Sequence, residues 1–255
     1  MKTITGVIIA KNEEKMIRPA LESLDFCNEI IVIDNGSTDK TVKVSEALGA
    51  KVYALDSDDF SEARNFGLSK TRSDYILYLD ADERLDEELA KNIKELLDKD
   101  SKFSGFKLKR KNFYFGNSQW PKAETLERLF LKDKLKSWKG KLHESPVYEG
   151  SLGKMDGFIM HYTHRDLTGM LDKTIDWSSK EAVLRFNAGH PKMSWWRFPR
   201  VMITAFLDSY IKKQGFKAGT AGLVESIYQA FSMFVTYAKL WELQHHYKKQ
   251  NEKSL

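Results

Sequence analysis

The first hundred residues alternate between short apolar runs and longer stretches in which apolar residues recur every three or four positions. The apolar runs predict buried β-strands at residues 4–10, 29–33, 51–55 and 75–79. The stretches between and after them predict helices within residues 11–25, 37–48, 61–69 and 87–97. Strands that are apolar along their whole length are typical of a parallel sheet with helices on both faces. We therefore expect an α/β fold with a mostly parallel central sheet.

The pattern changes after residue 100. Three further segments have the character of strands, which we expect to be antiparallel additions to the sheet: residues 106–109, 113–115 and 126–131. From Leu167 onward the spacing is mostly helical, and glycines at 189, 215, 219 and 222 separate the helices. We expect one α/β domain over residues 1–165, with halves at 1–100 and 101–165, and a helical C-terminal extension over 166–255.

The composition excludes several classes of protein. Hydrophobic residues make up 42% of the 255 residues and charged residues 30%, which is typical of a globular chain and not of a disordered one. The single cysteine, Cys27, cannot form an intramolecular disulfide, which favours a reducing compartment. The chain leads directly into a predicted strand without the features of a secretory signal. We therefore expect a cytoplasmic protein.

The tail has two features of segments that bind a membrane surface, although no stretch of about 18 residues is apolar enough to span one. One feature is a cluster of aromatic and basic residues, which comprises Trp195, Trp196, Arg197, Phe198 and Arg200. The other is a stripe of apolar residues at helical spacing, which comprises Leu223, Ile227, Phe231, Phe234 and Ala238. Packing of the stripe on the protein's own core and peripheral attachment to the inner face of the cell membrane both stay open.

The charge is unevenly distributed along the chain. The net charge of +5 indicates an anionic partner, but residues 1–100 carry 22 Asp and Glu against 14 Lys and Arg. Residues 101–141 carry 12 Lys and Arg against 3 acidic residues, with several aromatic residues among them. The basic surplus therefore belongs to the middle of the chain and to its tail.

Polar side chains follow several of the predicted strands, at the edge where open α/β sheets bind ligands. Asp80 and Asp82 come directly after an apolar run, and positions i and i+2 of an extended segment point to the same side. Two carboxylates so close favour a cation between them, and hard divalent ions commonly share their ligands with a phosphate. The pair therefore indicates a metal-bound phosphate ligand. Asn12, Asn35 and Asp39 also have a simpler interpretation as turn and cap residues.

Four motifs in order resemble family 2 glycosyltransferases, and most closely their lipopolysaccharide-core β-glucosyltransferase branch. They are residues 7–14 (VIIAKNEE), 31–39 (IVIDNGSTD), 60–65 (FSEARN) and 79–83 (LDADE). The resemblance covers residues 1 to about 165 and only loosely the tail. It implies a GT-A nucleotide-sugar-binding fold and an inverting transfer from a nucleotide-diphospho-sugar, with UDP-hexose as the expected donor.

The resemblance also implies roles for single residues. Nucleotide-sugar contacts would come from Ala10, Asn12, Glu13, Asp34, Arg64, Asp80 and Ala81. Among these, Glu13 and Asp34 would contact the base and ribose, Arg64 would lie near the base or diphosphate, and Asp80 would reach the ribose or a metal-bound water. Asp82 would bind the metal directly. For Asn12 and Asn65, a role in holding loop backbone stays open.

An inverting transfer also needs a base that removes the proton of the acceptor hydroxyl. The candidate is Glu144, in a weakly periodic stretch after the basic block, where the family has a His-Glu pair; His143 is the alternative. His161 matches the family position that completes the metal site, and His164, three residues on, is expected at the surface. A histidine ligand favours Mn²⁺ over Mg²⁺.

The basic block at 101–141 would line the acceptor side, attracting a lipid-linked or cell-envelope glycan, or would form a solvated charged face. Alternatives from other classes are an aspartyl-nucleophile phosphatase, which also has a D-x-D loop, and a nucleic-acid-binding protein that uses the basic block. Arg84 stands where the phosphatase class expects Thr or Val, and no nucleic-acid recognition module is recognisable. We therefore expect no nucleic-acid partner.

Overall fold

The computed structural model describes residues 1–57, 59–140 and 144–252. The chain forms two compact units, which are described separately. The first comprises Met1–Lys111 and Ala123–His161, and the second Asn112–Lys122 and Tyr162–Leu255. The chain therefore crosses between the units more than once.

The first unit is built on a mixed sheet. The strands of the described residues are β1 (Ile4–Ala10), β2 (Glu29–Asp34), β3 (Lys51–Ala54), β4 (Tyr75–Asp80), β5 (Glu83–Leu85), β6 (Gly105–Tyr114), β7 (Ser118–Gln119), β8 (Glu124–Leu131), β9 (Leu135–Lys139), β10 (Ser145–Tyr148) and β11 (Leu152–Tyr162). Nine of these form one sheet in the order β3-β2-β1-β4-β8-β6-β11-β5, with β7 paired to β6, while β9 and β10 form a separate antiparallel pair. The strands from β3 to β4 are parallel, and β8 is antiparallel to both β4 and β6. The parallel strands and the antiparallel additions after residue 100 are as predicted.

Four helices accompany the parallel strands: α1 (Ile17–Glu22), α2 (Thr41–Ala47), α3 (Phe60–Lys70) and α4 (Glu87–Leu97). The last two begin at capping carboxylates, because Asp59 accepts from the Ser61 backbone N–H and Asp86 from that of Leu89. The prediction of a helix over residues 11–25 was too long. Residues 11–16 form turns instead, and their backbone N–H groups bind side chains of the segment that follows β2.

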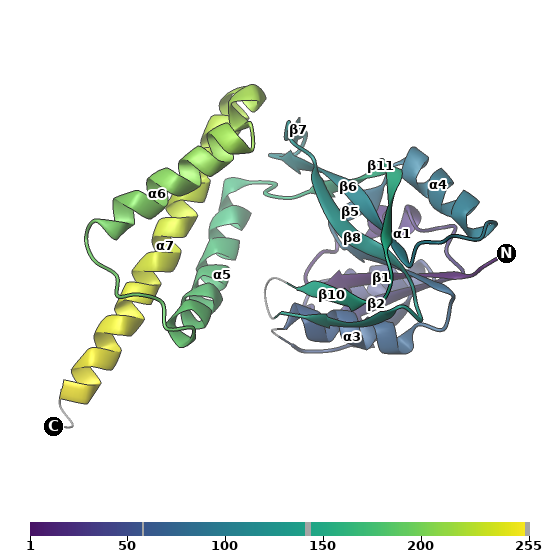
Figure 1. The fold of residues 1–255 in the computed structure, drawn as a ribbon, viewed down its shortest axis with the longest axis horizontal. Coiled ribbons are helices and arrows are strands. Elements are labelled where there is room, and N and C mark those ends of the chain that lie inside the picture. The colour runs from purple at the N-terminus through teal and green to yellow at the C-terminus, as the bar shows by residue number, and fades with distance from the viewer. Residues whose placement is uncertain (58, 141–143, 253–255) are drawn as a thin grey trace. The chain divides into compact units, whose positions relative to one another are not determined.

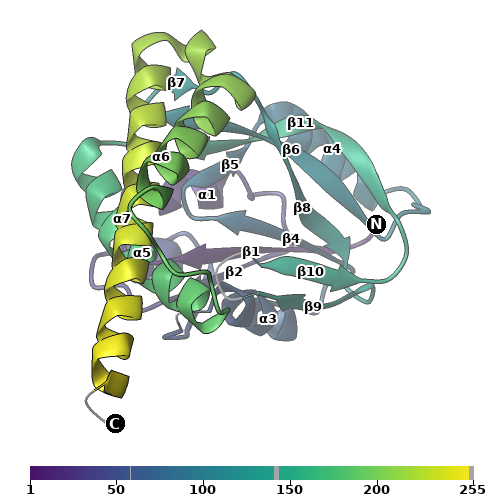
Figure 2. The same ribbon diagram turned by 60° about the vertical axis from the view of Figure 1, so that its left-hand side comes forward.

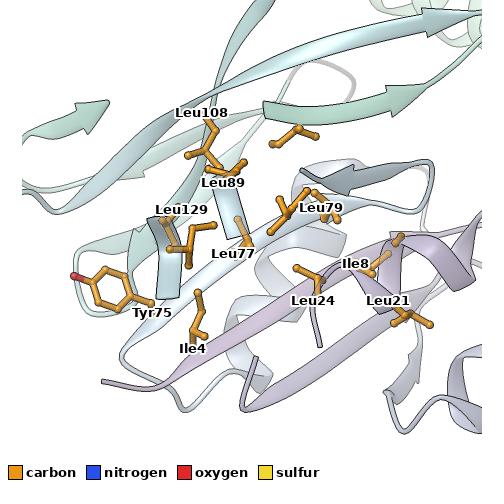
Figure 3. Packing of buried hydrophobic residues seen from close by; sticks show 14 of the residues in the cluster. Ile4, Ile8, Leu21, Leu24, Tyr75, Leu77, Leu79, Leu89, Leu108 and Leu129 are labelled. Atoms are coloured by element: carbon orange, nitrogen blue, oxygen red, sulfur yellow. The ribbon is translucent and has the colours of Figure 1, made fainter. Parts of the chain in front are cut away.

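The core explains why the parallel strands are continuously apolar. Alternate residues of each strand enter two separate clusters, one on each face of the sheet. On one face, Ile4, Ile8, Leu77 and Leu79 pack with Leu21 of α1, Leu24 in the turn after α1 and Leu89 of α4, as Figure 3 shows. On the other face, odd positions of β1 and β2 and even positions of β4 pack with α3 and β9. Since both faces are covered, both sets of side chains must be apolar.

The second unit consists mainly of three helices: α5 (Leu167–Asn187), α6 (Arg197–Leu207) and α7 (Gly219–Glu252). A π-helical turn (Asp208–Lys212) continues α6, and a 3-10 turn (Gly215–Ala218) precedes α7. Both α5 and α6 pack along α7 (Figures 1 and 2). None of the helices among the described residues combines the length and the apolar character that crossing a bilayer requires.

The hairpin at residues 112–122 belongs to this second unit. The indole of Trp120 is buried beside Gly215, where a Cβ on the glycine would come within 2.8 Å of it. His164 Nδ1 lies 3.0 Å from the carboxylate of Glu225 in α7, and its ring packs between Tyr114 and Tyr228. These contacts join the hairpin and the segment before α5 to the helices.

Candidate active site

The carboxyl ends of β1, β2 and β4 bring together side chains from three of the sequence motifs. In the register of the sheet, Ala10 pairs with Asp34 of β2, and Ile9 pairs with Asp80 of β4. This is the edge at which ligands bind in open α/β sheets. Ala10 and Ala81 are both buried, so a ligand would meet them through their backbone atoms.

Asn12 and Asn65 hold backbone, as one of their two interpretations predicted. The Asn12 side-chain oxygen accepts from the Thr38 backbone N–H at 2.7 Å, and the Asn12 residue itself has a positive φ of 54°. The Asn65 amide pairs in both directions with the backbone of Trp138, at 2.7 and 2.9 Å. Asn35 and Asp39 likewise accept from the backbone N–H groups of Ser57 and Thr41. These residues shape the loops around the site.

Asp34 is buried at the end of β2 and retains an acceptor atom. Its Oδ2 accepts from the Ser37 backbone N–H at 3.2 Å, whereas its buried Oδ1 has no hydrogen-bond partner within the part of the chain that the structure describes. A buried oxygen without a donor is costly, and a ligand hydroxyl or ring N–H would satisfy it. Glu13 lies in the turn after β1, where its backbone N–H binds the Thr41 hydroxyl.

Two buried arginines and two partly exposed carboxylates form a cluster at the end of β4, which we call the arginine–carboxylate quartet. Arg64 of α3 is 1% exposed and donates to Glu144 from Nε at 2.9 Å and to Asp80 from Nη2 at 3.0 Å. Arg128 of β8 donates to the other oxygen of Asp80 at 3.1 Å, and its Nη1 lies 3.8 Å from Glu144. The four formal charges cancel, which is how charged groups can be buried together.

Electrostatics keep Asp80 and Arg64 of the quartet ionised. Burial by itself would raise the pKa of Asp80, but the charges of Arg128 and Arg64 outweigh it and hold that pKa well below its usual value. Burial would lower the pKa of Arg64, and the charges of Asp80 and Glu144 outweigh it and raise the pKa. The Arg64 guanidinium also lies over the rings of Tyr78 and Trp138, with its Cζ 5.5 and 5.0 Å from their centroids. Arg64 therefore fixes the position of two carboxylates.

Arg128 was not predicted from the sequence, and neither were Glu83 and Arg110, which support the quartet. Glu83 is fully buried, accepts from the Asp80 backbone N–H at 3.0 Å and forms an ion pair with Arg110 at 2.8 Å. The only signal for Arg128 is that it directly precedes the apolar run Leu129-Phe130-Leu131, and it is weak because Glu124 and Glu127 of the same strand are charged. An arginine that is buried at such a position needs an acidic partner.

Replacement of Arg128 by Met is expected to destabilise the fold. Asp80 and Glu144 would then share only Arg64, which leaves one buried negative charge without a partner and costs about 3 kcal/mol of unfolding free energy. Denaturant titration measures this loss. The matched control is Lys107→Met, which breaks the partly exposed pair with Glu127 and should cost less than about 1 kcal/mol. Equal losses in the two variants would contradict a buried role for Arg128.

Asp82 and His161 meet beside the quartet. Asp82 lies in the turn between β4 and β5, and the pairing of β5 with β11 sets His161 opposite Glu83. His161 Nε2 is 3.4 Å from Asp82 Oδ1, and both side chains are largely buried. Burial would lower the pKa of His161, but the hydrogen bond with Asp82 and the negative charges of Asp82 and Glu83 together outweigh burial and raise the pKa.

The Asp82–His161 pair fits a divalent cation. Mg²⁺ and Mn²⁺ commonly use one or two protein ligands and complete their shell with phosphate oxygens and water. In the described ranges no group of three or more His, Cys, Asp and Glu side chains is placed to hold a metal ion. A cation here would therefore depend on oxygens of the ligand.

His164 does not share the environment of His161. It was expected at the surface, but its side chain is only 20% exposed and pairs with Glu225 in the second unit. The backbone at His164 has a positive φ of 45°, which turns the chain after β11. His143, the alternative base, lies outside the described residues.

The sheet order, with carboxylates at the ends of its parallel strands and an Asp–His pair where the antiparallel strands join, defines the GT-A class of nucleotide-sugar-binding folds. Over residues 5–151 the chain matches the model of one family of such enzymes. The protein belongs to glycosyl transferase family 2, as the four sequence motifs predicted.

Relatives of similar length extend this likeness over nearly the whole chain. The chain is 31% identical to an uncharacterized glycosyltransferase of Rickettsia typhi, over 95% of this chain and 88% of that one. It is 26% identical to the lipopolysaccharide core biosynthesis glycosyltransferase LpsC of Rhizobium meliloti, over 94% and 92%. Among solved structures it is similar to glucosyl-3-phosphoglycerate synthase from Mycobacterium tuberculosis in complex with Mg²⁺ and UDP, with 29% identity, a TM-score of 0.34 and 44% of each chain covered.

Proposed function

We propose that this glycosyltransferase is an inverting, metal-dependent enzyme that moves a hexose from a UDP-sugar to a hydroxyl group of a lipid-linked or cell-envelope glycan. The observation that carries the proposal is the Asp82–His161 pair at the carboxyl edge of the sheet, beside the arginine–carboxylate quartet. We propose that the enzyme acts in the cytoplasm. Membership of the family replaces the phosphatase interpretation of Asp80 and Asp82.

Glu144 is the proposed base. Its carboxylate accepts the acceptor's proton as the hydroxyl oxygen attacks the anomeric carbon, while the bond from that carbon to the diphosphate oxygen breaks. Inversion follows because the attack comes from the face opposite the leaving group. Arg64 and Arg128 form ion pairs with Glu144 and hold its carboxylate close to Asp80.

The donor is held by the remaining residues. The unsatisfied Oδ1 of Asp34 would accept from a ribose hydroxyl or from the N–H of a uracil ring, and Glu13, in the adjacent turn, would contact the base. Asp82 and His161 would hold Mn²⁺ or Mg²⁺, which when bound supplies positive charge to the leaving diphosphate. A direct contact of Arg64 with the base or diphosphate is also proposed, through its Nη1, for which the described residues provide no acceptor.

The acceptor is proposed from two features. LpsC, which aligns along nearly the full chain, is named for lipopolysaccharide core biosynthesis. The basic block at residues 101–141 carries the positive charge that a phosphorylated or acidic glycan would attract.

The proposal is tested by titrating the full-length protein with UDP in Mn²⁺ and in EDTA, followed by a screen of UDP-, GDP- and ADP-sugars for slow hydrolysis with Mn²⁺. We expect Mn²⁺ to tighten UDP binding at least about tenfold, because two diphosphate charges approach an acidic strand edge. UDP release should be fastest from a UDP-hexose. Nucleotide binding that is indifferent to the metal, or hydrolysis of only a purine nucleotide sugar, would contradict the proposal.

A further inference from the structure

The outer face of α6 is apolar and exposed. Residues Ile203, Leu207 and Ile211 recur every four positions along α6 and its π-helical continuation, and they are 59%, 44% and 57% exposed. The opposite side of α6 packs on the second unit's own core, since Phe198 and Val201 contact the cluster around Leu240. The apolar outer face therefore has no partner within its own unit in the described part of the chain.

Positively charged residues flank this apolar stripe along the sequence. Residues 192–217 contain six cationic residues and one acidic residue, Asp208. The Asp208 carboxylate is already paired with Lys212 at 3.1 Å and Lys213 at 3.3 Å. Arg197 and Arg200 lie before the apolar stripe and Lys217 lies after it, so cations stand at both ends.

Tryptophan side chains stand at the start of α6. Trp195 is 83% exposed, and the ring of Trp196 has the guanidinium carbons of Arg197 and Arg200 at 5.0 and 5.8 Å from its centroid. Tryptophan and arginine together are typical of the interface between water and lipid, where each presents an apolar body and a polar tip.

A cavity of about 520 Å³ opens beside the stripe, between α6, α7 and the segment before α6. Arg197, Arg200 and Lys213 line it together with Thr204, Gln229 and Asp208, whose carboxylate pairs with Lys213. Its cations and hydrogen-bond donors suit the phosphate of a lipid headgroup.

We propose that the outer face of α6 binds an anionic phospholipid bilayer. The helix lies in the plane of the interface, with Ile203, Leu207 and Ile211 at the acyl boundary, the cations at the level of the phosphates and one anionic headgroup in the cavity. This inference concerns the second unit and does not rest on the proposed function. A second copy of the chain is the poorer occupant, because two such faces would bring twelve cations together with two acids, both already paired.

The test is flotation of the full-length protein with vesicles of phosphatidylglycerol and phosphatidylcholine, or of phosphatidylcholine alone, at low salt. We expect binding to the anionic vesicles only, weakening as salt rises. The triple variant Ile203→Asp/Leu207→Asp/Ile211→Asp should bind at least about tenfold more weakly, since it loses apolar burial and gains negative charge. The double variant Arg200→Gln/Lys217→Gln leaves the apolar stripe intact. Its affinity for anionic vesicles should fall about fivefold for each cation removed.

The matched control is Ile175→Asp. Ile175 is a 63% exposed apolar residue of α5, outside the α6 segment, so this variant should float with the vesicles as the unmodified protein does. Fluorescence adds a second measurement, since Trp195 should shift to the blue on anionic vesicles and Trp195→Phe should reduce that shift. The proposal is overturned if the unmodified protein stays in the soluble fraction at low salt. It is equally overturned if both α6 variants float normally, or if the triple variant turns a dimer into a monomer while no form of the protein binds vesicles.

Discussion

Replacing Glu144 by Gln slows sugar transfer by about 10²–10⁴-fold and leaves UDP binding unchanged. Gln has nearly the shape of Glu and can still accept the Arg64 N–H that Glu144 accepts at 2.9 Å. It carries no charge, however, and cannot take the acceptor's proton. Release of UDP from the donor that the hydrolysis screen identifies measures the rate, and calorimetric titration with UDP and Mn²⁺ measures binding.

The matched control for this variant is Glu149→Gln. Glu149 follows β10 at the surface and pairs only loosely with Lys136, at 3.4 Å, so its replacement should leave turnover as it was. Because Glu144→Gln leaves the quartet with one net positive charge, its melting temperature should fall, and unchanged UDP binding at the assay temperature shows that the site has kept its structure. If Glu144→Gln turns over at the full rate, the base lies elsewhere and His143 becomes the first candidate.

Replacing Asp82 by Ala is expected to abolish the metal dependence of UDP binding. The variant removes one of the two protein ligands proposed for the cation, and His161 alone cannot hold it against water. UDP affinity in Mn²⁺ should fall to the value measured in EDTA, and turnover should drop at least about 100-fold. Titration with UDP in both conditions measures the first effect and UDP release the second.

Two controls separate a metal ligand from a general loss of negative charge. Asp156→Ala removes an exposed carboxylate from β11, the strand that carries His161, and should change neither measurement. His164→Ala should retain the Mn²⁺ effect, because His164 pairs with Glu225 and not with Asp82. If His164→Ala also lost the Mn²⁺ effect while His161→Ala kept it, the assignment of the two histidines would be reversed.

The strands and most helices could be predicted from the sequence because their signals are local. The period of the apolar residues predicted α4 with its observed bounds, residues 87–97. The same reasoning failed at residues 11–16, since apolar spacing does not reveal that distant side chains bind this backbone. The period of the apolar residues also could not predict the order of the strands, because the pairing of β4 with β8 joins residues about 50 positions apart.

The site was predictable only where its residues belong to a recognisable motif. Asp82 and His161 were predicted as a pair by family resemblance, and the structure brings them within 3.4 Å. Arg128 carries no motif, and an arginine in a strand of a basic segment looks like part of a charged surface. Only the pairing of β8 with β4 brings its guanidinium to Asp80.

The chain passes from the first unit to the second, back to the first and again to the second, which limits where it can be truncated. Residues 112–122 lie inside the sequence of the first unit but belong to the second, where Trp120 is buried beside Gly215. A version ending near residue 165 would therefore keep this hairpin and lose what covers it, exposing a large aromatic side chain. Exchanging the helical tail between relatives meets the same restriction, and a working chimaera would have to carry residues 112–122 along with the tail.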